Sequence, residues 1–119
     1  MISTKRAYDP PQPRDGLRIL VDRLWPRGIK KEDLLLDDWI KDVSPSDELR
    51  KWFAHENVKW PQFVKRYFKE LDENKACWQA LLNKSKHHHV TLLYGAKDTE
   101  HNNAVALKQY LESKELRPN

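Results

Sequence analysis

Residues 21–28, with the sequence Val-Asp-Arg-Leu-Trp-Pro-Arg-Gly, gather the side chains best suited to chemistry. They place an acid (Asp22), two guanidinium groups (Arg23 and Arg27) and an indole (Trp25) directly after an apolar run. Arginine recognises phosphate or carboxylate through paired, planar hydrogen bonds, and a neighbouring ring can stack on a flat ligand. The motif therefore predicts an anion site, although it does not identify a reaction.

Each of these side chains also has a structural interpretation. Asp22 and Arg23 are candidates for a catalytic role, with Asp22 orienting a hydroxyl or a water, but an ion pair that closes a strand end is the simpler interpretation. An adjacent arginine lowers a carboxyl pKa, which favours an ionised acceptor over a proton donor. An indole after a buried strand is more often core than ligand contact, so core is favoured for Trp25. Arg27 is the better anion ligand, because Gly28 lets backbone N–H groups approach a phosphate.

The positive charge is concentrated in the first part of the chain. The net charge is +4, and residues 1–31 hold eight Lys or Arg against three Asp, a local balance of +5. Such an excess attracts small phosphates, acidic metabolites or nucleic-acid backbones. Because arginine dominates over lysine in this stretch, a specific anion site is favoured over a charge that only maintains solubility.

Apolar periodicity predicts the elements that position these side chains. Strands are expected over residues 2–8, 17–21 and 90–94, the last two as continuous apolar runs buried on both faces. Helices are expected over residues 44–54, from Pro61, over 73–84 and over 102–113, with Ser44 or Ser46 as the first N-cap and Pro45 at the first helical position. Residues 31–43 fit either a short strand or a helical turn. Strands that alternate with helices predict a single α/β domain, with a small, mostly parallel sheet and about four helices.

In open parallel sheets, ligands bind outside the carboxyl ends of the strands. The loops over residues 22–28 and 95–103 are therefore expected at one edge, where they form a shared pocket. Its expected members are the possible catalytic pair Asp22 and Arg23, the anion ligands Arg6, Arg14, Arg27 and Lys97, the stacking rings Trp25 and Tyr94, and the further pocket residues His101 and Asn102.

Other motifs carry weaker signals. The run His87-His88-His89 lacks a neighbouring carboxylate or cysteine at ligand spacing, so a solvated loop is favoured over a metal site. Cys77 has no Cys-x-x-Cys partner and suits a reducing compartment. No Gly-rich phosphate loop, His-Glu-x-x-His or Gly-x-Ser-x-Gly pattern occurs, and no cofactor is expected. Without a secretory or membrane-spanning run, a cytoplasmic location and no membrane partner are expected.

Several strings together resemble a known family. They are Lys5-Arg6-Ala7-Tyr8-Asp9, residues 20–28, Ser44-Pro45-Ser46, Leu92-Leu93-Tyr94 and Asn102-Asn103-Ala104. On these, the chain resembles the YeaO-like family of uncharacterised bacterial proteins, a branch of family 488 of the domains of unknown function. The resemblance covers nearly the whole length and implies a small cytoplasmic α/β protein of prokaryotic type. It implies no activity, cofactor or catalytic residue.

Two functional hypotheses follow. The first is a small enzyme or ligand-binding protein for a phosphorylated or nucleotide-like molecule. The second is a module that binds nucleic acid or a protein through the same basic face, which an extended stripe of cations with exposed rings would favour. Arginines placed in turns after strands, rather than along one helix, favour the first. The oligomeric state is left open.

Overall fold

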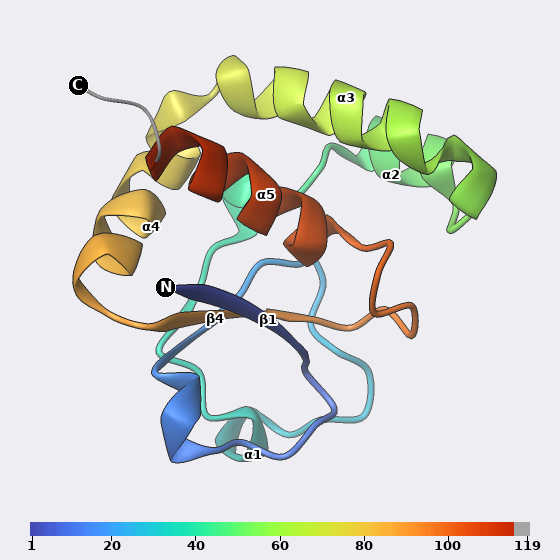
Figure 1. Cartoon of the computed structure of the whole chain (residues 1–119). Helices are drawn as coiled ribbons and strands as arrows, with labels where there is room; N and C mark the ends of the chain where they lie inside the picture. Colours follow the sequence, from blue (N-terminus) through green and yellow to red (C-terminus); the bar gives the residue numbers. More distant parts are fainter. Residues whose placement is uncertain (116–119) are drawn as a thin grey trace.

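Four parallel strands form the sheet at the centre of the structure, a computed structural model that describes residues 1–115 (Figure 1). The strands are β1 (Ile2–Arg6), β2 (Leu17–Leu20), β3 (Asp38–Trp39) and β4 (Val90–Tyr94), in the order β1-β4-β2-β3. Every pairing between neighbours is parallel, which confirms the predicted sheet. All five residues of β4 are buried, as expected for an apolar central strand.

The predicted helices are present with shifted ends. They are α2 (Asp47–Phe53), α3 (Trp60–Asp72), α4 (Lys75–His87) and α5 (Asn103–Glu115). Residues 31–43, which the sequence left open, divide into the single-turn helix α1 (Lys31–Leu34), β3 and a 3₁₀ turn. Two further 3₁₀ turns span Pro13–Asp15 and Asn57–Lys59.

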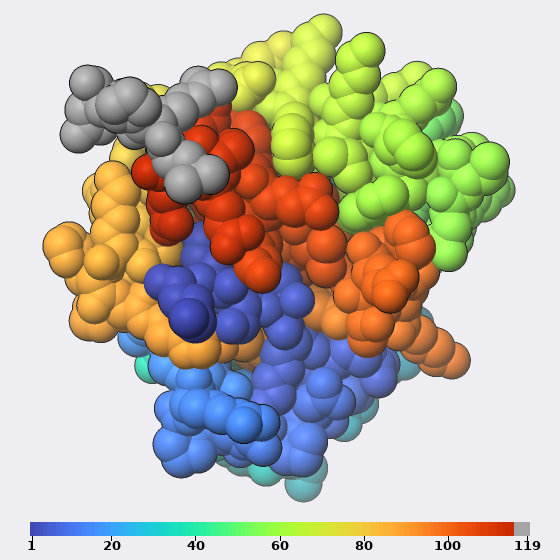
Figure 2. Space-filling view, in the orientation of Figure 1, coloured from blue at the N-terminus to red at the C-terminus, as the bar shows by residue number. Residues whose placement is uncertain are grey.

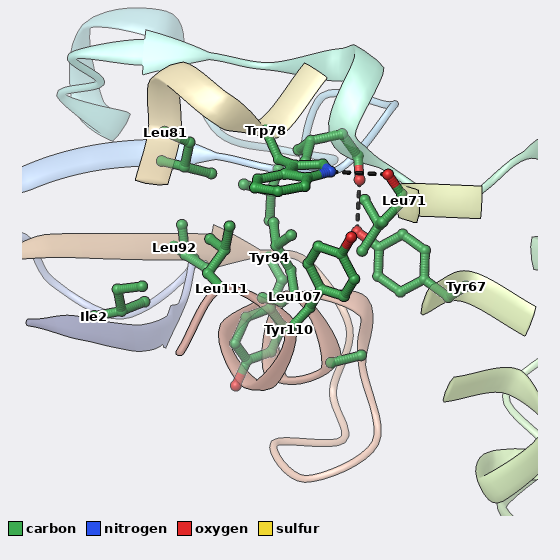
Figure 3. Close-up of a cluster of buried hydrophobic side chains, with 14 of the residues drawn as sticks. Ile2, Tyr67, Leu71, Trp78, Leu81, Leu92, Tyr94, Leu107, Tyr110 and Leu111 are labelled. Carbon is green, nitrogen blue, oxygen red and sulfur yellow. Dashed lines mark hydrogen bonds between the residues drawn. The ribbon is translucent and has the colours of Figure 1, made fainter. Parts of the chain in front are cut away.

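The two faces of the sheet have separate cores. Figure 1 shows α3, α4 and α5 on one side of the sheet and α1 on the other. The larger core packs helix side chains such as Tyr67, Trp78 and Leu107 against Ile19 and Leu92 of the sheet (Figure 3). The smaller core consists of Ala7, Leu20, Leu34 and Leu93. Since successive strand residues face opposite sides, Leu92 and Leu93 belong to different cores.

A carboxylate on α3 fixes the start of α2. Ser46 is the N-cap, because its hydroxyl accepts the backbone N–H of Leu49 at 3.1 Å. The carboxylate of Glu70 accepts both the backbone N–H and the hydroxyl of Ser46, at 2.9 and 2.6 Å. Of the two serines predicted as cap, Ser46 is therefore the right one, and Pro45 precedes the cap instead of opening the helix.

A buried ion pair supports the side of the sheet that α1 covers. The guanidinium of Arg18 donates to Asp15 Oδ2 at 2.6 Å and to the carbonyl oxygen of Leu34 at 2.8 Å. Burial opposes ionisation of Asp15, but hydrogen bonds from the Gln12 backbone, Lys5 and Arg18 outweigh it and lower its pKa. Part of the amino-terminal positive charge is thus structural rather than available to a ligand.

Candidate anion-binding site

A cavity of about 550 Å³ opens at the carboxyl edge of the sheet, between the loops after β2 and β4. The helix pair α2–α3 closes it on one side and the chain after β1 on the other. Figure 2 shows the segment between β4 and α5, in orange, at the surface between these helices, in green, and the first residues of the chain, in blue. The predicted meeting of the two loops at one edge is therefore confirmed.

Asp22 joins these loops at the cavity wall. Its Oδ2 accepts the backbone N–H of Gly95 at 2.8 Å, and its carbonyl oxygen accepts the indole N–H of Trp39 at 2.7 Å. Burial raises the pKa of Asp22, against the opposing effects of hydrogen bonds from Gly95 and Asn103 and of the charges on Arg50 and His55. The expected lowering of this pKa by the adjacent arginine is therefore wrong, and Arg23 pairs with Asp47 instead. The carboxylate thus holds the two strand ends together and also lies near the cations of the cavity.

Two arginines meet on one carboxylate oxygen at the α2 side of the cavity. Asp47 Oδ1 lies 3.0 Å from Arg50 Nη2 and 3.5 Å from Arg23 Nε. Within residues 1–115, Arg23 Nε is the one buried side-chain polar atom without a hydrogen bond. With Nε turned to Asp47, the terminal amino groups of Arg23 form no hydrogen bond or ion pair within residues 1–115, so their donors remain for a ligand.

Arg27 lies on the opposite side of the cavity. The hydroxyl of Tyr8 donates to the carbonyl oxygen of Arg27 at 2.8 Å, which fixes this loop beside the end of β1. The Arg27 side chain is exposed and pairs with no group of the described part of the chain. Arg6 lies at the rim, where its Nε donates to the Ala96 carbonyl at 3.0 Å and its guanidinium lies over the Tyr8 ring.

Two imidazoles complete the polar wall. Nδ1 of His101 lies 3.0 Å from Asp98 Oδ2, and the His101 ring packs edge-on against Trp60. Hydrogen bonds from the backbones of Glu100 and His101 hold the pKa of Asp98 at about 2. His55 follows α2 in a left-handed conformation with a φ of 58°, which is uncommon outside glycine and orients the ring against Phe53.

The structure brings together six of the predicted site residues and holds one more at the rim. Asp22, Arg23, Trp25, Arg27, His101 and Asn102 line the cavity, with Arg6 at the edge. Asn102 itself is committed to the fold, because its side-chain oxygen caps α5 at the Val105 N–H and its amide donates to the Asp98 carbonyl.

Three predicted residues do not reach the cavity. Arg14 lines a second cavity beneath β1, because the proline loop folds back along that strand. Lys97 is exposed outside the cavity wall. The prediction that Tyr94 stacks on a ligand is wrong, since its ring is only 2% exposed and lies among core side chains (Figure 3). Tyr94 shares the face of β4 that carries Leu92, and this face packs against the helices.

Trp25 is half-buried and mainly structural. Its indole N–H donates to the Ile29 carbonyl at 2.7 Å, and its ring packs edge-on against Trp39 at 5.4 Å between centroids. The ring borders both the smaller core and the cavity. The favoured core interpretation therefore agrees with these contacts, and only the remaining edge of the ring is open to a ligand.

Sequence reasoning missed the contribution of α2 and its C-terminal end. Arg50, Phe53 and His55 line the cavity, although the apolar spacing of this segment indicates only a core helix. Tyr8 and Phe63 line it as well. The adjacent left-handed residues Ala54 and His55 were not predictable, because neither is a glycine or asparagine.

The weaker motifs take structural places. His87 ends α4, and Ser3 Oγ lies 2.8 Å from His89 Nε2 at the start of β4. Residues 1–115 contain no group of three metal-ligating side chains. Burial raises the pKa of the Cys77 thiol. Within the same residues, no helix has the length and apolarity needed to cross a membrane.

Comparisons with known proteins agree with the resemblance inferred from the sequence. A family model described as the inactive DUF488-N3 subclade matches residues 1–119. The uncharacterized protein YeaO of Escherichia coli (strain K12) is 49% identical over 112 residues, which cover 94% of this chain and 97% of that protein. The uncharacterized protein Rv3073c of Mycobacterium tuberculosis (strain H37Rv) is 44% identical over 75 residues, 63% of this chain and 64% of that protein. No solved structure gives a significant match. The chain therefore belongs to the YeaO-like branch of the DUF488 family.

Proposed function

We propose that the cavity binds a phosphate-bearing small molecule, of which a nucleotide-like compound is one example. The observation that carries this proposal is the charge of the wall. Three arginines, Arg23, Arg27 and Arg50, line the cavity, where Asp22 is the one carboxylate among the lining residues. Asp47 lies beside the wall and pairs with Arg23 and Arg50. Guanidinium groups form paired, charge-assisted hydrogen bonds with phosphate oxygens, so these side chains supply the donors that such a ligand requires.

Apolar groups provide the remainder of a ligand site. Phe53, Phe63 and Trp25 border the cavity beside the arginines. A concave cavity with a few convergent polar groups is typical of small-molecule sites. A flat basic stripe with exposed rings would favour nucleic acid instead, but the cations here surround a hollow of about 550 Å³.

The proposal is for binding and does not require turnover. The matching family model is described as an inactive subclade, which favours a protein that holds its ligand unchanged. Asp22 accepts the Gly95 N–H through one carboxylate oxygen. Its remaining acceptor capacity can orient a hydroxyl or a water next to the anion. Arg23 would contribute its terminal donors to the phosphate.

Calorimetric titration with inorganic phosphate at low ionic strength tests this proposal. The double variant Arg27→Ala/Arg50→Ala should lose measurable binding, because each charge-assisted contact contributes about 1.5–3 kcal/mol. The matched control is Arg14→Ala/Lys97→Ala, which removes the same charge from exposed positions outside the cavity. It should bind phosphate within about twofold of the wild type, since distant exposed charges are screened.

A melting curve for each variant separates binding from folding. If the wild type binds no phosphate, or if both double variants lose affinity equally, the cavity is not the anion site. A loss confined to Arg27→Ala/Arg50→Ala with an unchanged melting temperature supports the proposal.

A further inference from the structure

The cations around the cavity form two separate groups on different walls, although Arg23 and Arg27 both belong to the loop after β2. On the β2 side, Arg23 and Arg50 converge on Asp47. On the β1 side, Arg6 lies over the ring of Tyr8, whose hydroxyl holds the Arg27 carbonyl. The first group is anchored by α2 and the second by the end of β1, so they belong to different walls of the same cavity.

The sheet order sets the spacing between the two strand ends beside which these groups lie. β4 lies between β1 and β2, and neighbouring strands are about 4.8 Å apart, so the ends of β1 and β2 are separated by about 10 Å. The space between them lies over the end of β4, where Gly95 and Ala96 line the cavity with little side-chain bulk.

One anionic group for each wall is the arrangement that matches two cation groups beside strand ends about 10 Å apart. We infer that the ligand is elongated and carries two anionic groups about 10 Å apart, one held by Arg23 and Arg50 and the other by Arg27 and Arg6. This inference rests on the proposed function and specifies the ligand class further. The middle of the ligand crosses the Gly95–Ala96 backbone beside Phe53 and Phe63.

Alkanediol bisphosphates of increasing chain length, with methyl phosphate as the reference, test the inference on the whole chain by calorimetry. Methyl phosphate should bind weakly, with two molecules per chain. Each bisphosphate should bind as one molecule per chain, with affinity highest at an intermediate length. Because the second contact becomes intramolecular, the best bisphosphate should bind about 10²-fold more tightly than methyl phosphate.

Single variants assign the two ends. Arg50→Ala and Arg27→Ala should each reduce the methyl phosphate stoichiometry to one and bring the best bisphosphate down to the affinity of methyl phosphate. Arg14→Ala, an exposed arginine beside the other cavity, should change neither value. NMR spectra recorded at one ligand per chain give a second readout. Under this condition the backbone amide signals near Arg50 and near Arg27 should shift together only with the bisphosphate of matching length.

The results distinguish this inference from the proposed function. If methyl phosphate binds but no bisphosphate binds more tightly, the two-anion inference is wrong while the anion site stands. An affinity that rises steadily with chain length would indicate apolar contacts and would also overturn it. If neither probe binds, both the inference and the proposed function fail.

Discussion

The carboxylate of Asp22 accepts the backbone N–H of Gly95 at 2.8 Å and thereby joins the ends of two neighbouring strands across 73 residues of sequence. The same bond keeps the loops on either side of the cavity at a fixed distance. Because burial raises the pKa of this carboxyl, the bond is made by a group whose charge is disfavoured in the fold.

The variants Asp22→Asn and Asp22→Ala distinguish the effect of the hydrogen bond to Gly95 on stability from the effect of the Asp22 charge. Asparagine keeps an acceptor for the Gly95 N–H and removes the buried charge, so its free energy of unfolding at neutral pH should equal or exceed that of the wild type. Alanine leaves the N–H without its partner and should lose about 1–3 kcal/mol. Urea unfolding measures both. An Asp22→Asn variant as unstable as Asp22→Ala would mean that attraction to Arg50 and His55, rather than the hydrogen bond, stabilises the loops.

Removal of Arg18 should be among the most destabilising single changes to the chain. Arg18→Met leaves Asp15 buried with only Lys5 as an ionic partner and frees the Leu34 carbonyl, and the loss of one partner of a buried pair costs about 3–5 kcal/mol. The double variant Asp15→Asn/Arg18→Met should recover part of this loss, because no unpaired charge remains. Chemical unfolding of the full double-mutant cycle gives the coupling energy. A coupling near zero would contradict a buried ion pair.

Asp15 also predicts how stability responds to acid. Its folded-state pKa lies below the ordinary value of 3.8, so it contributes stability above that value and loses it as the pH falls through the folded pKa. The free energy of unfolding should therefore fall below about pH 4, and less steeply in Asp15→Asn. Asp22 contributes to the pH dependence of stability with the opposite sign. Because burial raises its pKa, protonation of Asp22 as the pH falls removes a buried charge and stabilises the fold. Identical pH profiles for the wild type and Asp15→Asn would exclude this assignment.

Two glycines with positive φ provide a matched pair. Gly16 has a φ of 65°, and a Cβ there would lie 2.2 Å from the His89 carbonyl oxygen, whereas Gly28 has a φ of 83° and open space around it. Gly28→Ala should cost about 1–2 kcal/mol for the backbone conformation alone. Gly16→Ala should cost clearly more, because the strand ends must also separate. Thermal melting compares the two variants. An equal loss of stability would mean that the loop before β2 shifts to make room for the new Cβ at no further cost.

The fold was predictable where local pattern and sheet physics agree. The apolar runs over residues 17–21 and 90–94 indicate buried strands, and parallel pairing brings the loops that follow them to one edge. That rule predicted the shared cavity that Asp22, Arg27 and His101 line, but it also placed Lys97 there, which lies outside.

The remaining site residues depend on tertiary placement that no local pattern encodes. Arg50 reaches the cavity because Glu70, on another helix, fixes the start of α2 through Ser46. Arg14 lies in the proline loop, which folds back along β1 and places this residue at the second cavity. The composition of the loop does not indicate that path. Tyr94 was misassigned because a strand buried on both faces has no polar side to indicate where its last side chain points.

The pairing of β1 with β4 has a kinetic consequence. Ile2 lies opposite Val90, so the first strand finds its neighbour only after almost the whole chain is available. Folding that depends on such distant contacts is slower than folding of helical proteins of similar size. During synthesis the apolar β2 leaves the ribosome well before β4, and it stays unpaired on that side until residues 90–94 follow. The cavity, which needs both loops, forms only in that late step, so a chain interrupted before Gly95 has no partial site.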